Sequence, residues 1–149
     1  MLVKLQPVSP LLGTEVPLPD YATAGAAAMD VRACITGPVT LSPGESALIP
    51  TGFILELPDG FAAFLFARSG LASREGICLS NGVGVIDSDY RGEVCVALRN
   101  LSRRPYTVQP GDRIAQMAVL PVEQATLQVT ESLSDTARGA GGFGSTGKQ

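Results

Sequence analysis

Residues 46–66 read SALIPTGFILELPDGFAAFLF, which is two apolar runs separated by the turn signal Pro-Asp-Gly. The runs cover 46–57 and 61–66, and short apolar or alternating runs bounded by such punctuation are typical of β-strands. No stretch here or elsewhere keeps the 3.6-residue apolar period of a helix for three turns. This part of the chain therefore predicts consecutive strands connected by a tight turn.

The same rhythm extends along the whole chain, in which 17 glycines and 11 prolines break the sequence at short intervals. Ser-Pro-Gly at 42–44 and Gln-Pro-Gly at 109–111 are further turn signals. Residues 69–75 contain good helix formers behind a candidate N-cap, Ser69. We predict an all-β domain with one short helix at that position. The remaining candidate strands are 29–33, 39–41, 83–86, 94–98 and 114–120.

Composition excludes several classes of protein. A length of 149 residues suits one domain, and a net charge of −3 with scattered Lys and Arg gives no basic stripe for a nucleic-acid polymer. The apolar runs fall far short of the ~20 residues that cross a bilayer, and no signal segment opens the chain. Cys34, Cys78 and Cys95 have no CxxC spacing, which favours a reducing compartment. We expect a soluble, cytoplasmic protein that associates with neither membrane nor nucleic acid.

The sequence contains no histidine. This excludes Ser-His-Asp and Cys-His nucleophile systems and every metal site that needs an imidazole ligand. A catalytic base in this chain must therefore be a carboxylate, Lys, Tyr or Cys.

Five segments place polar residues beside glycine within the apolar β pattern. Taken singly, Asp30 is a turn acid and Asp-Ser-Asp at 87–89 is a solvated turn. Residues 67–72 bring a guanidinium, a hydroxyl and backbone amides to a strand-to-helix junction, which favours an anion. A hairpin is the structure expected over 81–93. The five segments are AGAAAMDV (24–31), ARSGLA (67–72), NGVGVIDSDYRGE (81–93), GDRIAQM (111–117) and RGAGGFGSTG (138–147).

The last segment contains two misleading patterns. Residues 139–144 match GxGxxG, but no βαβ pattern surrounds them. Residues 142–148 nearly match a Walker A loop, but Gln149 stands where Ser or Thr is required. By composition the segment is a flexible tail, dense in backbone amides and suited to wrapping phosphates.

In this order and at these spacings, the five segments resemble the five motifs of the trimeric dUTP diphosphatase family, over nearly the whole chain. The resemblance implies a distorted jelly-roll β fold and a homotrimer whose active sites are each assembled from more than one subunit. It also implies a domain over 1–137 and a Gly-rich tail over 138–149 that closes over a neighbouring subunit's site. The implied reaction is hydrolysis of dUTP to dUMP and pyrophosphate, by attack of water on the α-phosphorus.

The resemblance further implies roles for individual residues. Asp87, the first acid of IDSDY, would be the general base that activates water. Mg²⁺ is the implied cofactor, with Asp30 orienting its waters, while Asn81 contacts uracil and Tyr90 packs under deoxyribose. The full set implied to bind substrate is Arg68, Ser69, Gly70, Asn81, Gly84, Ile86, Tyr90, Gln116, Arg138, Phe143, Gly144, Ser145 and Thr146.

Two departures from the family pattern leave the implied base untouched. Ala67 stands where the family more often has Pro, which loosens the junction at 67–72. Ala140 stands where a longer polar residue is common.

Two other functions compete with this interpretation. A dCTP deaminase is similar in fold and assembly but lacks such a tail, and it needs a glutamate base beside the pyrimidine C4, for which Glu93 is a distant candidate. A catalytically idle trimer would sense nucleotide or bind a regulatory protein through its tail. A catalytically idle protein is expected to have lost at least one residue of the active site. This sequence retains Asp87, Arg68, Gln116 and Phe143.

Overall fold

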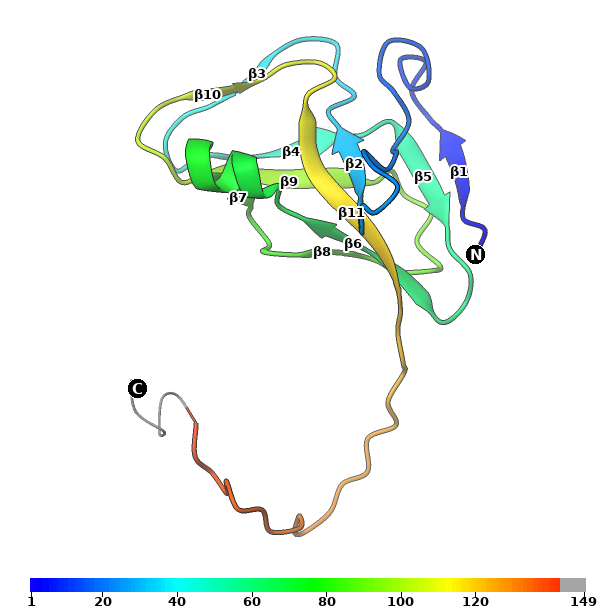
Figure 1. Cartoon of the computed structure of the whole chain (residues 1–149), viewed down its shortest axis with the longest axis vertical. Coiled ribbons are helices and arrows are strands. Elements are labelled where there is room, and N and C mark those ends of the chain that lie inside the picture. Colours follow the sequence, from blue (N-terminus) through cyan, green and yellow to red (C-terminus); the bar gives the residue numbers. More distant parts are fainter. Residues whose placement is uncertain (143–149) are drawn as a thin grey trace.

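The structure is a computed structural model that describes residues 1–142. Within them the chain forms eleven β-strands and one short helix, a single π-helical turn (Figure 1). The predicted all-β fold with a helix inside 69–75 is thereby confirmed. The elements are β1 (Lys4–Pro7), β2 (Met29–Arg32), β3 (Val39–Leu41), β4 (Ser46–Pro50), β5 (Phe53–Glu56), β6 (Phe61–Phe66), η1 (Leu71–Glu75), β7 (Ile77–Leu79), β8 (Gly84–Ile86), β9 (Cys95–Asn100), β10 (Tyr106–Val108) and β11 (Arg113–Pro121).

The strands form a four-stranded sheet in the order β2-β11-β6-β8, a three-stranded sheet in the order β4-β9-β7, and the pairs β1-β5 and β10-β3. Every pairing is antiparallel. The core lies between the two larger sheets, because most of the residues that their strands bury are apolar. Its largest members include Val31, Ile49, Phe53, Ile77, Val96, Leu98 and Met117.

The predicted run over 46–57 divides into β4 and β5 at Gly52. This glycine has φ 81°, and a Cβ there would lie 2.6 Å from the Cys34 sulfur, so both the backbone and the space require glycine. The predicted strands at 39–41 and 61–66 coincide with β3 and β6. The strands β1, β7 and β10 were not predicted, since each has only three or four residues and little alternation.

The three predicted turns all form. The N–H groups of Glu45, Phe61 and Asp112 each donate to the carbonyl three residues earlier, at 3.0, 3.2 and 3.1 Å. Gly60 has φ 77° in the turn between β5 and β6, a conformation that glycine adopts without strain. This turn fixes the start of β6, whose two ends carry the residues of interest below.

The hairpin expected over 81–93 is not formed as two strands bonded to each other. Strand β8 pairs with β6, and β9 pairs with β4 and β7. The turn was predicted from local signals. However, the two arms on either side of it, β8 and the start of β9, each pair with strands that are distant in sequence. As a result the arms belong to different sheets, and a cleft of about 420 Å³ lies between them.

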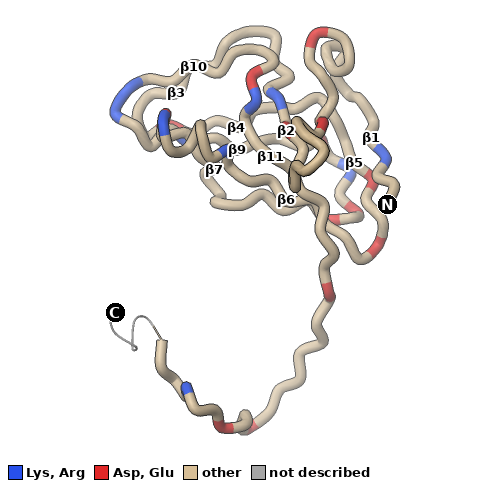
Figure 2. Tube along the Cα trace, in the orientation of Figure 1, with Lys and Arg blue, Asp and Glu red and all other residues tan. Residues whose placement is uncertain are grey.

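After β11 the chain leaves the body as an extended segment (Figure 1). Among the residues that the structure describes, its last backbone bond to the rest of the fold runs from the Val122 N–H to the Gly60 carbonyl, 2.9 Å, and residues 123–140 are exposed. The predicted division at 137 and 138 stays a prediction. Figure 2 shows Lys and Arg scattered over the body rather than gathered on one face. None of the helical structure in residues 1–142 has the length and apolar character of a membrane span.

Candidate active site

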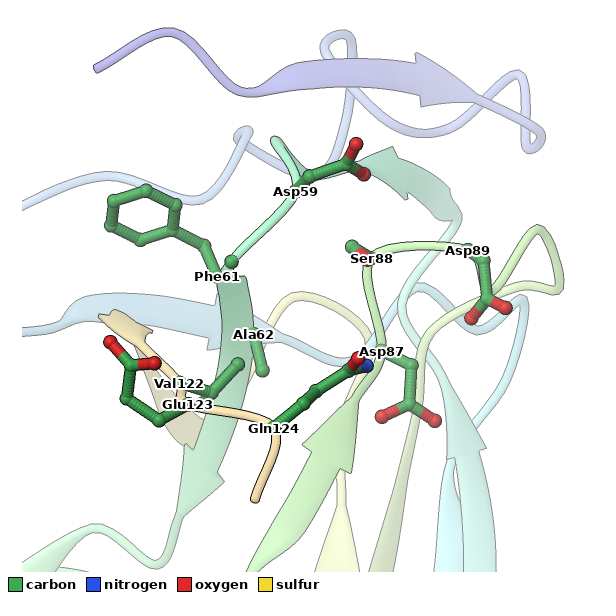
Figure 3. A pocket seen from close by; sticks show the side chains of 10 residues that line it. Asp59, Phe61, Ala62, Asp87, Ser88, Asp89, Val122, Glu123 and Gln124 are labelled. Atoms are coloured by element: carbon green, nitrogen blue, oxygen red, sulfur yellow. The ribbon is translucent and has the colours of Figure 1, made fainter. Parts of the chain in front are cut away.

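Asp87 directly follows β8 and is exposed. It lines the 420 Å³ cleft between the arms together with Ile86 and Tyr90. It also lines a larger hollow of about 880 Å³ on the other side, where Figure 3 shows the side chain of Gln124 extending toward it. No ion pair to Asp87 occurs within residues 1–142. The carboxylate is therefore open to solvent and in contact with a cleft, as a base that activates water must be.

The turn that carries Asp87 is held by its own backbone and by one side chain. The Tyr90 N–H donates to the Asp87 carbonyl at 3.2 Å. The Arg91 guanidinium Nη1 donates to the carbonyls of Ser88 and Tyr90 at 2.7 and 3.0 Å. Arg91 was not predicted as a site residue, because a surface arginine after a turn gives no sign of which carbonyls it will reach.

The cleft between the arms has one apolar wall and one free backbone edge. Leu48, Val85 and Cys95 line it, and β8 is the edge strand of its sheet, so one of its backbone edges is unpaired within the described chain. Partial burial, followed by the nearby Glu93 charge, raises the pKa of the Cys95 thiol above its ordinary value. Cys95 therefore presents a neutral, weakly polar surface to whatever enters the cleft.

Glu93 also lines this cleft, but its carboxylate is already engaged. Its Oε1 accepts the Gly52 N–H at 2.8 Å, which ties the start of β9 to the break between β4 and β5. A carboxylate used in this way has little freedom to shuttle protons. The contact argues against Glu93 as the base of a deaminase.

The structure brings together only part of the expected base-binding set. Ile86 and Tyr90 line the cleft with Asp87. Asn81 lies on the exposed turn before β8, and neither it nor Gly84 lines this cleft. Their predicted contacts with uracil stay predictions.

A second cluster forms at the other end of β6, around Asp30. This residue is 8% exposed, with Oδ2 3.0 Å from Arg113 Nη1 and Oδ1 3.3 Å from Arg68 Nε. Arg68 Nη1 also donates to the Arg113 carbonyl at 3.1 Å. The carboxylate thus holds two guanidiniums in place, and the two cations are the partners that a largely buried acidic side chain requires.

Sheet register explains why these side chains meet. Gln116 on β11 is paired with Asp30 on β2 and with Phe66 on β6. Arg68 lies just beyond Phe66, so the cations and the half-buried Gln116 amide share one end of the sheet. Arg113 was not predicted as a site residue, because the register between β2 and β11 is set by contacts distant in sequence.

Ser69 and Gly70 follow Arg68, as expected, but Ser69 does not cap the helix, which has no side-chain cap. Its carbonyl instead accepts the Ser73 hydroxyl at 2.6 Å. The Ala72 N–H is also occupied, because it donates to the Arg68 carbonyl at 2.9 Å. The prediction of a helix cap at Ser69 was wrong.

The described residues offer no cage for a resident metal ion. No group of three or more acidic or thiol side chains is positioned to ligate one within residues 1–142. Both oxygens of Asp30 face guanidiniums, and Oδ1 is buried without a hydrogen-bond partner. Waters on a magnesium ion would have to compete with the arginines for this carboxylate, so the predicted role of Asp30 stays untested.

The two clusters lie at opposite corners of one sheet. Since Ala63 pairs with Ile86, Asp87 lies beside Ala62, and an extended chain from Ala62 to Arg68 spans roughly 20 Å at about 3.3 Å per residue. The pairing of Arg68 with Asp30 draws its guanidinium toward β2, the outer strand farthest from β8. Within one chain the two clusters are therefore separate.

The remaining predicted residues belong to the C-terminal segment. Arg138 is exposed, and its Nε donates to the Gly141 carbonyl at 2.7 Å on the extended stretch away from the body (Figure 1). Phe143, Gly144, Ser145 and Thr146 lie outside the described residues.

Comparison with known proteins identifies relatives over nearly the full length. A sequence model described as dUTPase matches residues 14–147. The deoxyuridine 5'-triphosphate nucleotidohydrolase of Hahella chejuensis is 54% identical over 137 residues, which is 91% of this chain and 90% of the relative. The protein of the same name from Aeromonas salmonicida is 46% identical over 148 residues, covering 99% and 97% of the two chains.

Solved structures show the same fold. The Staphylococcus bacteriophage 80alpha dUTPase with dUPNHPP has a TM-score of 0.87 at 23% identity and covers 99% of both chains. A phage phi11 dUTPase mutant of S. aureus, described for its coordination of a structural Mg(II) ion, has a TM-score of 0.78 at 20% identity, over 91% of this chain and 100% of that one. From the match over residues 14–147 and the curated relatives, this chain belongs to the dUTPase family.

Proposed function

We propose that this chain hydrolyses dUTP to dUMP and pyrophosphate, which would keep uracil out of DNA and supply dUMP for thymidylate synthesis. The observation that carries the proposal is the exposed carboxylate of Asp87 at a cleft shared with Tyr90, in a member of the dUTPase family. The names of the curated relatives support the same substrate.

Asp87 is the proposed general base. It would accept a proton from a water molecule as that water attacks the α-phosphorus, and the electron pair of the broken P–O bond would leave with pyrophosphate. A positioned carboxylate contributes about 10²–10⁴-fold to such a step. In a chain without histidine, an exposed acid that has no ion pair within residues 1–142 suits this role.

The cleft between the arms is the proposed uracil site. Uracil presents acceptor, donor and acceptor along its pairing edge, and the free edge of β8 offers N–H and carbonyl groups to match them. Cytosine reverses part of this set, which would leave backbone groups unpaired. Tyr90 would pack under the sugar, where a ribose 2′-OH would clash with its ring.

The cluster around Arg68 and Gln116 is the proposed phosphate site. Arg68 is held by Asp30 and by the Arg113 carbonyl, so its guanidinium is oriented before substrate arrives. Mg²⁺ would enter with the triphosphate as part of the substrate complex, because this ion prefers phosphate oxygens and water to a protein cage. When bound, it would neutralise charge on the pyrophosphate leaving group.

A complete site then requires more than one chain. Roughly 20 Å of extended chain, at about 3.3 Å per residue, separates Ala62, beside which Asp87 lies, from Arg68. We infer that, in the homotrimer implied by the resemblance, the Asp87 turn of one subunit lies near the Arg68 cluster of another. The segment from Arg138 onward is proposed, from the resemblance alone, to close over a neighbouring subunit's site with Phe143 on uracil.

The function is tested by incubating the purified protein with Mg²⁺ and dUTP, dCTP, dTTP or UTP in separate reactions. Proton release and pyrophosphate are expected from dUTP, with far slower turnover of the other three. Ammonia from dCTP would indicate a deaminase instead. No turnover of any nucleotide would indicate an idle, nucleotide-sensing protein.

A further inference from the structure

The backbone conformation at position 92 does not explain why the residue there is a glycine. Its φ lies outside the left-handed range in which glycine is favoured, so an L-residue would be allowed there. It follows the turn closed by the Tyr90 N–H and the Asp87 carbonyl and precedes β9, outside any strand. The reason for glycine must therefore be the space around it.

That space is filled by the Tyr90 ring. A Cβ built on Gly92 would overlap the hydroxyl, Cζ and Cε2 atoms of Tyr90. The ring lies against the Gly92 backbone, with its hydroxyl 3.4 Å from the Glu93 carbonyl. All three overlapping atoms belong to the far end of a side chain that is 45% exposed.

The surface beneath the ring is itself fixed. The Glu93 carboxylate accepts the Gly52 N–H at 2.8 Å, and the Val94 N–H donates to the Phe53 carbonyl at 2.9 Å. On the other side, Arg91 binds the carbonyls of Ser88 and Tyr90. Since the backbone on both sides of Gly92 is anchored, the ring would have to move if a methyl group were added.

We propose that Gly92 is the positioning residue that sets sugar selectivity, by leaving the space that Tyr90 occupies at the edge of the cleft. The inference rests on the proposed function, in which Tyr90 packs under deoxyribose. A methyl group at position 92 would displace the ring. The steric penalty against a 2′-OH would fall, while the fold would be largely retained because an exposed ring gives way easily.

The test compares Gly92→Ala with Gly37→Ala. Gly37 also has an ordinary φ, but no atom lies within 4 Å of its hypothetical Cβ. Both variants and the wild type are labelled with 3-fluorotyrosine; the chain has 3 tyrosines, so ¹⁹F spectra are simple, and Tyr90→Phe assigns the Tyr90 signal. The ratio of kcat/KM for dUTP to that for UTP is measured in parallel.

Gly92→Ala is expected to shift the Tyr90 resonance and to lower the dUTP to UTP ratio by about tenfold, the scale of a one-methylene change in a pocket. Gly37→Ala should change neither. A Tyr90 resonance that stays in place, or an unchanged ratio despite a shifted resonance, would overturn the proposal. A wild type without dUTP turnover would refute the proposed function, and the spectrum would still decide whether Gly92 holds the ring.

If Gly92→Ala does not fold, the double variant Gly92→Ala with Tyr90→Ala decides the question. The proposal predicts that the double variant folds, because removal of the ring removes the overlap. A double variant that also fails to fold would show that Gly92 is needed for a reason other than Tyr90.

Discussion

The two ends of strand β6 lie beside the two parts of the proposed site, and these parts are built in opposite ways. At one end, Arg68 is locked in an ion-pair cluster around the largely buried Asp30. At the other end, Asp87 is exposed and without an ion pair in the described chain, and only its turn is fixed, by Arg91 and by backbone bonds.

This difference matches the two tasks. A group that binds a polyanion gains from being oriented in advance, because less freedom is lost on binding. A base gains from an unpaired carboxylate, since an ion pair would occupy the oxygens that must accept the proton. The comparison therefore predicts that substitutions at the Asp87 end act on kcat, and those at the Arg68 end on binding and stability.

The largest effect is expected from Asp87→Asn. The amide keeps the size of the side chain but does not accept a proton, so kcat should fall about 10²–10⁴-fold with little change in KM. Steady-state assays with dUTP measure this. Asp89→Asn is the control, because Asp89 belongs to the same turn and lines only the larger hollow. Equal losses of kcat in the two variants would show that Asp87 is not the general base.

An intermediate effect is expected from Asp30→Asn. Two guanidiniums would lose their charged partner, which should lower the free energy of unfolding by about 1–3 kcal/mol and raise KM for dUTP. Urea unfolding and steady-state kinetics measure the two changes. Asp20→Asn is the control, since the exposed Asp20 carboxylate has no ion pair among the described residues and accepts a hydrogen bond from the Tyr21 N–H. A fully stable Asp30→Asn with normal KM would show that the cluster is incidental.

A smaller effect is expected from Arg91→Ala. Loss of its bonds to two carbonyls would loosen the turn and misplace Asp87, lowering kcat by about 3–10-fold, the value of a bond or two. Arg99→Ala, an exposed residue of β9, should behave as wild type. A change in KM rather than kcat in Arg91→Ala would show that the turn contributes to substrate binding. The contrast between the Asp87 turn and the Arg68 cluster would then weaken.

The features that the sequence predicted are those encoded by neighbouring residues. Strand β6 and the turn at Gly60 follow from an apolar run and a Pro-Asp-Gly signal. Asp87 and Tyr90 also fall within one short motif, so their closeness in the sequence is enough to keep them close in the structure. Local chemistry was sufficient in each case.

The features that the sequence did not reveal depend on partners distant in the chain. The arms at 81–93 reverse direction as expected, but β8 and β9 bond to different strands. The contact of Arg113 with Asp30 depends on the register of β11 against β2. The role of Gly92 depends on the position of the Tyr90 ring, and no turn signature in the sequence predicts that position.

The central claim is that Asp87 and Arg68 act in one site but come from different chains. The most direct measurement mixes the Asp87→Asn protein, impaired in kcat, with the Arg68→Ala protein, impaired in binding, dissociates and reassembles them at equal amounts, and assays dUTP hydrolysis at low substrate concentration, where each parent is nearly inactive. In a closed cyclic oligomer with sites shared between subunits, about a quarter of the sites would regain both residues, and activity should rise to roughly that fraction of wild type. If the reassembled mixture stays as inactive as its two parents, each chain carries a complete site and the account is contradicted.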